Sequence, residues 1–169
     1  MVIEFEQLNP LQRQAIEEYS KTVCYSMNID LRQDRFPLWW DMFHNEERTK
    51  IIDSIFSLTP TKSNPPILYR GTQNIDLYNN PEFTEKGFMS TSLNESIAQK
   101  HIHKENGAVL KIHLQDSNIH ILEVESQFNE SEYLLSRNTN FKVLYRVEET
   151  NPLTNQIVLV VGVCPLIAF

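Results

Sequence analysis

The feature that most constrains the fold is a change in hydrophobic spacing at a proline-rich loop, residues 59–66. Before this loop, apolar residues recur every three or four positions, which is the spacing of one helix face. After it, short runs alternate apolar and polar residues, as half-buried strands do. Helices first and mostly antiparallel strands afterwards indicate an α+β fold. The chain has 169 residues, enough for one domain with a hydrophobic core. We expect a single domain, 1–169, with a helical front at 1–60 and a strand-rich core at 67–169.

The helical front has a clear start signal. Asn9 is a typical N-cap residue, and Pro10 is favoured at the first helical position. Apolar residues then follow at helical spacing as far as Val23. The pattern predicts two more helices, over Tyr25–Arg32 and over roughly Leu38–Leu58.

The second half predicts seven strands and one short helix. The loop at 59–66 precedes the first strand, and that strand ends in glycine. We expect a helix over Asn94–Lys100 and strands over Ile67–Gly71, Gly87–Ser92, Ala108–Leu114, Ile119–Val124, Glu132–Leu135, Phe141–Val147 and Gln156–Val163. We expect these strands to form two mostly antiparallel sheets that flank a cleft.

Charge and composition exclude several classes of function. The formal net charge of −7 argues against a nucleic-acid partner held by phosphate contacts. No apolar run reaches transmembrane length, and the first residues lack the basic and apolar regions of a signal peptide. We therefore expect no membrane partner and a cytosolic site of action, in the cell that makes the protein or in a host cell that receives it. Cys24 and Cys164 lack metal-ligand spacing, and no histidine has metal-ligand neighbours, so we predict no metal.

Two polar motifs stand at predicted strands. Arg70-Gly71 ends the first strand, where a guanidinium can hold a pyrophosphate and glycine lets a ligand approach the backbone. The alternative is a surface arginine before a turn. Ser90-Thr91-Ser92 lies on the second strand, with Ser90 and Ser92 on one face, where a hydroxyl can orient a carboxylate. The alternative is a solvated edge strand.

A third motif, Glu130-Ser131-Glu132, opens the strand that runs to Leu135. In an extended segment its two carboxylates share a face and repel each other. Such a pair suits chemistry at a positively charged centre, where it stabilises an oxocarbenium-like sugar and orients an acceptor. The alternative is an ordinary Glu-x-Glu on a solvated strand face.

The three motifs in this order resemble those of the R-S-E class of mono-ADP-ribosyltransferases, which includes bacterial ADP-ribosylating toxins, vertebrate ecto-enzymes and some phage enzymes. The segments Ala15–Ser20 and Tyr25–Arg32 are similar to the toxin helices, with Met27 in place of the usual isoleucine. Leu134–Phe141 is similar to the family's Leu-Leu-Pro-Arg-Gly-Ser-x-Phe, with Ser136 and Asn138 in place of proline and glycine. Asn tolerates left-handed backbone, so the turn can survive. The resemblance covers the chain from about residue 9 to its end.

The resemblance implies that NAD binds in a cleft between two perpendicular sheets and that ADP-ribose is transferred with loss of nicotinamide. Arg70 would hold the NAD diphosphate, and Gly71 would lie against nicotinamide. Ser90 would steady the catalytic Glu132. Glu132 would bind the 2′-hydroxyl of the nicotinamide ribose and stabilise the oxocarbenium-like transition state.

The resemblance also implies how the acceptor is chosen. In this class a glutamate at the first position of the motif, here Glu130, goes with arginine acceptors, and Phe128 would dock the target protein. The alternative for Phe128 is a core phenylalanine at a strand end. By the same resemblance, Arg32 and Asn28 are candidates to contact the NAD phosphates or adenosine, and for Arg32 the alternative is a salt bridge at a helix end.

The leading hypothesis is thus an enzyme whose partners are NAD and a target protein that presents an arginine, without a metal. Two alternatives stay open. One is an NAD glycohydrolase of the same fold, with water as acceptor. The other is a catalytically silent binding module, which the presence of Arg70, Ser90, Glu130 and Glu132 disfavours.

Overall fold

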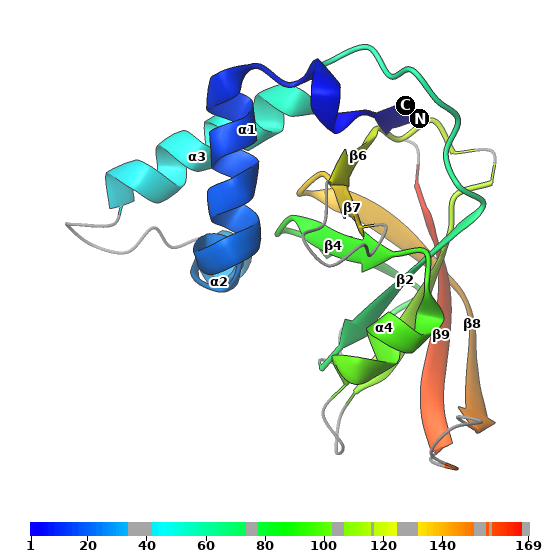
Figure 1. Cartoon of the computed structure of the whole chain (residues 1–169). Coiled ribbons are helices and arrows are strands. Elements are labelled where there is room, and N and C mark those ends of the chain that lie inside the picture. Colours follow the sequence, from blue (N-terminus) through cyan, green and yellow to red (C-terminus); the bar gives the residue numbers. More distant parts are fainter. Residues whose placement is uncertain are drawn as a thin grey trace.

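The computed structural model describes residues 1–33, 42–73, 78–102, 107–115, 117–124, 132–150, 155 and 157–166. Its first part is helical, and Figure 1 shows the helices grouped beside one end of the strands. The helical elements are a 3₁₀ turn at Phe5–Gln7, α1 at Pro10–Glu18, a π-helical turn at Tyr19–Val23, α2 at Cys24–Gln33 and α3 at Met42–Ile55. The helical front predicted from the sequence is therefore confirmed, although the part of the third helix at 38–41 lies outside the described residues.

The start of α1 follows the predicted signal. The Asn9 side chain accepts a hydrogen bond from the backbone N–H of Gln12 at 2.9 Å, and the Gln12 side chain accepts one from the Asn9 N–H at 3.1 Å. Pro10 occupies the first turn. This reciprocal cap satisfies two of the N–H groups that a helix start leaves without partners. The π-helical turn at Tyr19–Val23 then joins α1 to α2, where the sequence predicts one regular helix as far as Val23.

The strands form one sheet and not the two that the sequence predicts. Its order is β1-β6-β7-β4-β2-β5-β9-β8-β3, and two pairings, β1 with β6 and β5 with β9, are parallel while the others are antiparallel. The strands are β1 at Val2–Ile3, β2 at Ile67–Thr72, β3 at Glu82–Glu85, β4 at Met89–Ser92, β5 at Ala108–His113, β6 at Ile121–Val124, β7 at Glu132–Leu135, β8 at Thr139–Thr150 and β9 at Ile157–Pro165, with helix α4 at Glu95–Lys100 after β4.

The reason for this correction lies between β2 and β4. These strands are paired at one position, Tyr69 with Ser92, whereas β2 and β5 are paired at six positions from Ile67 to Thr72. The link joins β1-β6-β7-β4 to the other strands, and Figure 1 shows β4 running across the direction of β9. The sheet is therefore continuous but strongly curled. Strands β2 and β4 separate at the place where the sequence predicted two different sheets.

The curl gives each half of the sheet an inner and an outer face. The inner faces share one core, made by residues such as Leu68, Met89, Leu110, Ile112, Leu135 and Phe141. The outer face of the β4–β7 half packs on the helical front through Leu122 and Leu134. The outer face of the β5–β9 half packs on α4 through Val109 and Val160. Because strand side chains alternate, neighbours such as Leu134 and Leu135 serve different cores.

Two strands were missed from the sequence, and one predicted turn is confirmed. The short β1 and β3 lack a long alternating run, and each is recognisable only by its pairing, with β6 and β8 respectively. In the turn after β7, Asn138 has φ 58°, as expected for an asparagine in place of glycine. Its neighbour Arg137 binds Asp53 of α3 with three contacts of 2.8–3.0 Å, which ties the turn to the helical front. Among the described helices, none has the length and apolar character needed to cross a membrane.

Candidate active site

A cleft of about 640 Å³ opens where β2 and β4 diverge. This volume is within the usual range for a site that encloses a small molecule or cofactor. The helical front supplies one side, and β2 with α4 supplies the other. The lining residues are Tyr19, Ser20, Asn28, Arg32, Tyr69, Arg70, Gly71, Thr72, Gln73, Tyr78, Glu85, Ser90, Thr91, Ser92, Ile97, Ala98, His101 and Glu132. Six of the predicted site residues, Asn28, Arg32, Arg70, Gly71, Ser90 and Glu132, are thus brought together.

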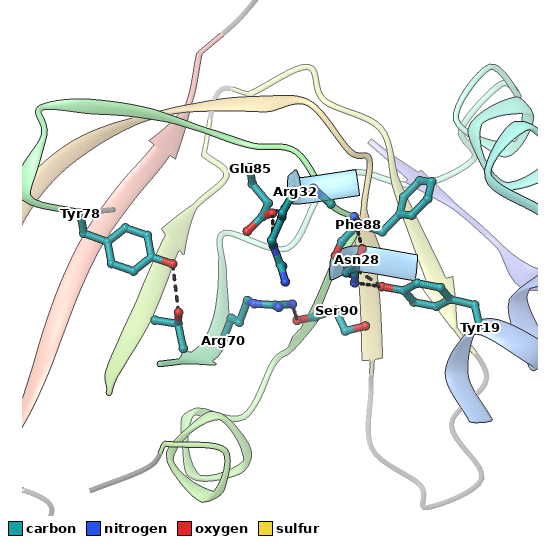
Figure 2. Close-up of polar contacts among 10 residues, drawn as sticks. Tyr19, Asn28, Arg32, Arg70, Tyr78, Glu85, Phe88 and Ser90 are labelled. Carbon is teal, nitrogen blue, oxygen red and sulfur yellow. Dashed lines mark hydrogen bonds and ion pairs between the residues drawn. The ribbon is translucent and has the colours of Figure 1, made fainter. Parts of the chain in front are cut away.

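Arg70 bridges the gap between the diverging strands. Its Nη1 donates a hydrogen bond to the backbone carbonyl of Ser90 at 2.9 Å, as Figure 2 shows. If the β2–β4 ladder continued past the pair Tyr69–Ser92, main-chain N–H groups of β2 would donate to the main-chain carbonyls of β4. The guanidinium takes the carbonyl instead, because a strand that leaves its ladder exposes groups that need partners. Arg70 has five N–H donors in total, so the remaining ones can still serve an anion in the cleft.

Gly71 is held by close packing against α4. A Cβ at this position would lie far inside van der Waals distance of the Ala98 carbonyl oxygen and at 3.0 Å from the Cβ of His101. Its φ is not positive, so the need for glycine comes from the approach of α4 and not from backbone strain. The packing brings Ile97, Ala98 and His101 to the cleft wall.

Ser90, Ser92 and Glu132 lie on one face of the sheet. In the pairing of β4 with β7, Ser92 stands directly opposite Glu132, and Ser90 stands opposite Leu134. Thr91 faces the other way and donates its hydroxyl to the Tyr133 carbonyl at 2.7 Å. Ser92 is therefore the direct cross-strand neighbour of the glutamate, and Ser90 is its diagonal neighbour. The sequence predicts that Ser90 steadies Glu132, and for this the Ser90 hydroxyl must reach diagonally across to the neighbouring strand.

Asn28 is buried and holds the segment before β4. Its Oδ1 accepts the Phe88 N–H at 2.8 Å, and its Nδ2 donates to the Phe88 carbonyl at 3.1 Å and to the Tyr19 hydroxyl at 2.8 Å. Figure 2 shows this cluster beside the cleft. Both ends of the amide are thus occupied by the protein, and Asn28 holds Phe88, two residues before Ser90. The predicted contact of Asn28 with NAD stays a prediction.

Arg32, one turn after Asn28 on α2, makes the salt bridge that the sequence left as an alternative. Its Nε donates to Oε1 of Glu85 at 2.8 Å. Burial by itself lowers the pKa of Arg32, but the hydrogen bond and the negative charge of Glu85 outweigh burial, and the pKa is raised. The guanidinium therefore stays charged, and it lines the cleft together with Arg70. The salt bridge and an anion-binding role are compatible, since the bond uses one of five donors.

The sequence profile of a family described as "ADP-ribosyltransferase exoenzyme" matches residues 4–162. That is nearly the whole chain, and it includes every residue of the cleft. The chain belongs to the ADP-ribosyltransferase exoenzyme family. No curated protein matches this sequence.

Solved structures of toxins share the fold. The Vis toxin of Vibrio splendidus superposes with a TM-score of 0.74 at 18% identity, over 97% of this chain and 76% of that one. The enzymatic component C2-I of the Clostridium botulinum C2 toxin gives 0.73 at 21% identity, over 95% and 45%. BECa of a C. perfringens binary enterotoxin, solved with NADH, gives 0.73 at 17% identity, over 96% and 45%. This chain thus spans less than half of two of these toxin chains.

Two residues predicted for acceptor recognition in this family member, Phe128 and Glu130, lie outside the described residues. The prediction that no metal is used also stays a prediction. Among the residues that the structure describes, no three histidine, cysteine, aspartate or glutamate side chains are grouped so that they could hold a metal ion.

Tyr78 and Glu85 are among the cleft residues that sequence reasoning missed. Tyr78 is buried, its hydroxyl lies 3.1 Å from Oγ1 of Thr72, and burial raises its pKa. Glu85 is buried at the end of β3. A signal for Glu85 exists in the alternation Glu82-Phe83-Thr84-Glu85, which puts the carboxylate on the same buried face as Phe83.

Proposed function

We propose that this chain is an NAD-dependent mono-ADP-ribosyltransferase that transfers ADP-ribose to an arginine side chain of a target protein and releases nicotinamide. The observation that carries this proposal is the meeting of Arg70, Ser90 and Glu132 at one cleft, in a chain of the ADP-ribosyltransferase exoenzyme family. Dinucleotide ligands in relatives give further support, since Exoenzyme S of Pseudomonas aeruginosa was solved with carba-NAD and BECa with NADH.

The diphosphate of NAD binds between Arg70 and Arg32 in this proposal. Both guanidinium groups line the cleft, and Figure 2 shows Arg70 extending toward Ser90 and Arg32 extending from the side of Glu85. Arginine is well suited to this task, because its planar fork of donors matches phosphate oxygens and its charge persists at all physiological pH values. The hydrogen bond from Arg70 to the Ser90 carbonyl restrains the guanidinium before NAD arrives.

Glu132 acts on the nicotinamide ribose. As the bond between C1′ and the nicotinamide nitrogen breaks, its electron pair leaves with nicotinamide, and positive charge develops on the ribose ring. A carboxylate held beside the 2′-hydroxyl opposes that charge and lowers the barrier. Ser92, opposite Glu132, and Ser90, one diagonal away, are the hydroxyls on the same face that can restrain it.

Glu130 acts on the acceptor. An arginine nitrogen attacks C1′, and the proton it loses passes to the Glu130 carboxylate as the new C–N bond forms. A carboxylate pairs with a guanidinium through two parallel hydrogen bonds, which favours arginine over other acceptors. The Vis toxin was also solved in complex with agmatine, a small molecule that carries a guanidinium group.

The experiment that tests the glycosidic step is nicotinamide release from NAD by the wild type and by Glu132→Gln. Loss of one charged group aimed at a developing charge lowers the rate by about 10²–10³. Glu149→Gln, on the exposed part of β8, is the matched control and should release nicotinamide at the wild-type rate. A Glu132→Gln protein that keeps the wild-type rate would exclude Glu132 from catalysis.

The acceptor assignment has a separate test with agmatine and a protein lysate as acceptors. Glu130→Gln should lose transfer to guanidinium groups, as measured by mass spectrometry, and keep some NAD hydrolysis. Intact arginine modification by this variant would show the acceptor assignment to be wrong. A wild type that makes only free ADP-ribose in the presence of both acceptors would instead be an NAD glycohydrolase.

A further inference from the structure

Glu85 is a buried carboxylate in the wall of the cleft, and the chemistry described so far does not use it. Only 6% of the residue is exposed, although it lines the cavity. A carboxylate is rarely this buried unless it is paired, because removal of a charge from water is costly. The other described acidic residue of the cleft wall, Glu132, has its place in the proposed reaction.

The contacts of Glu85 join two parts of the molecule. One carboxylate oxygen, Oε1, accepts the Nε–H of Arg32 at 2.8 Å and the backbone N–H of Gly87 at 2.9 Å. Arg32 belongs to α2 in the helical front, whereas Gly87 precedes β4 in the strand half. The same helix also holds Phe88 through Asn28. Glu85 is therefore held by two contacts, and it restrains the Arg32 guanidinium, which lines the cleft.

The choice of nitrogen determines where that guanidinium points. A bond to Nε occupies the inner side of the fork and leaves the two terminal NH₂ groups for another acceptor. Figure 2 shows the Arg32 guanidinium, held by Glu85, directed toward the guanidinium of Arg70. Both guanidinium groups line the cleft, and the Glu85 carboxylate places a negative charge against the positive charge of Arg32. The raised pKa of Arg32 reflects the same carboxylate.

We propose that Glu85 is a positioning residue that orients Arg32 for the diphosphate of the dinucleotide and thereby sets the affinity of the cleft for diphosphate-bearing ligands. The inference rests on the proposed function, since it assigns a part of the same NAD site. It differs from a merely structural role in one respect. If Glu85 only joined α2 to β3, its loss would change stability and the rate of the chemical step. The affinities for ligands with and without phosphate would then change equally.

The test compares ligands with and without a diphosphate. In Glu85→Ala, the KM for NAD and the dissociation constant of ADP-ribose, measured by calorimetry, should each rise about tenfold, the size of a lost charge-assisted hydrogen bond. The kcat of nicotinamide release and the inhibition constant of nicotinamide, which carries no phosphate, should stay within about twofold of wild type. Glu82→Ala is the matched control, since Glu82 lies exposed on the same strand and should change neither constant.

A second variant guards against misfolding. Glu85→Gln keeps an oxygen that can accept from Arg32 and Gly87 and removes the charge, so the same two constants should rise by less than in Glu85→Ala. In an Arg32→Ala background, Glu85→Ala should add little further loss, because the two residues act on one contact. Equal loss in both backgrounds, tighter ADP-ribose binding by either Glu85 variant, or an equal rise in the nicotinamide constant would overturn the proposal.

The outcome is separable from that of the proposed function. A wild type that releases nicotinamide, combined with Glu85 variants that bind ADP-ribose as the wild type does, would overturn the role of Glu85 alone. A wild type that binds ADP-ribose but releases no nicotinamide would overturn the enzymatic proposal, and the calorimetric constants would still decide the role of Glu85. A wild type that binds neither NAD nor ADP-ribose would overturn both.

Discussion

The two walls of the cleft are assembled in different ways. On the helical side, the α2 residues Asn28 and Arg32 hold the segment from Glu85 to Phe88 through side-chain hydrogen bonds. On the other side, Gly71 of β2 lets the backbone of α4 approach so closely that any side chain would collide with the Ala98 carbonyl. One wall depends on specific polar groups, and the other depends on the absence of a side chain.

The difference shows which changes each wall can absorb. A side chain such as Asn28 can rotate away from an added methyl group at the cost of its hydrogen bonds. A helix carbonyl such as that of Ala98 can move only if α4 moves with it, because cores and packed backbones relax incompletely. Substitutions in the polar wall should therefore each lower the free energy of unfolding by a limited amount. A substitution in the close-packed wall should displace α4 and cause a larger loss.

The largest expected effect is at the close-packed wall. Gly71→Ala should lower the free energy of unfolding by about 3 kcal/mol, the upper range for overpacking, and should abolish most nicotinamide release because α4 moves. Urea denaturation and the release assay measure the two effects. Wild-type stability in this variant would contradict the close packing of β2 and α4.

The next effect is at the polar wall. Asn28→Ala leaves the buried N–H of Phe88 without its side-chain acceptor, removes one of the two side-chain donors to the Phe88 carbonyl, and should cost about 2 kcal/mol of unfolding free energy. Gln14→Ala in the exposed part of α1 provides a control for a lost amide on the helical front. If the urea midpoint of Asn28→Ala equals that of the control, the amide does not hold the wall.

A glycine-to-alanine substitution at Gly87, in the polar wall, should have a smaller effect than the same substitution at Gly71. A Cβ at Gly87 would lie 2.6 Å from Oδ1 of Asn28, a side-chain atom that can move. Gly87→Ala should therefore cost about 1 kcal/mol, less than Gly71→Ala. In an Asn28→Ala background it should cost almost nothing more, because the colliding atom is gone. Equal costs for Gly87→Ala in both backgrounds would place the strain elsewhere.

The smallest effect lies outside both walls, at the contact between Nε2 of His113 on β5 and the Tyr145 hydroxyl on β8, 3.0 Å apart. Partial burial, followed by the charge of Lys111, lowers the pKa of His113 below its usual 6.5. The folded state then binds the proton less readily than the unfolded chain. This contribution to stability is complete above about pH 6.5 and is lost as the pH falls through the lower folded-state pKa.

Melting temperatures between pH 5 and pH 8 test this expectation. Replacement of the imidazole in His113→Gln should flatten the pH dependence slightly and leave the KM for NAD unchanged, since neither His113 nor Tyr145 lines the cleft. A steeper fall in stability at low pH in the variant than in the wild type would reverse the sign of the argument.

The sequence predicted the features that depend on residues close together along the chain. The cap at Asn9, the left-handed turn at Asn138 and the strand at Glu132–Leu135 follow from neighbours along the chain, and each was predicted where it occurs. The strand β3 and its residue Glu85 were missed, because a four-residue strand is recognisable mainly by its pairing with β8.

The candidate site divides in the same way. The sequence by itself supplied the motif residues Arg70, Ser90 and Glu132 and the α+β order of elements, because residue type and hydrophobic period are local properties. The tertiary structure alone decided that one curled sheet replaces two, that Ser92 faces Glu132 directly, and that Arg32 is held by Glu85. These features depend on strand register and on long-range pairing, which residue spacing along the chain does not specify.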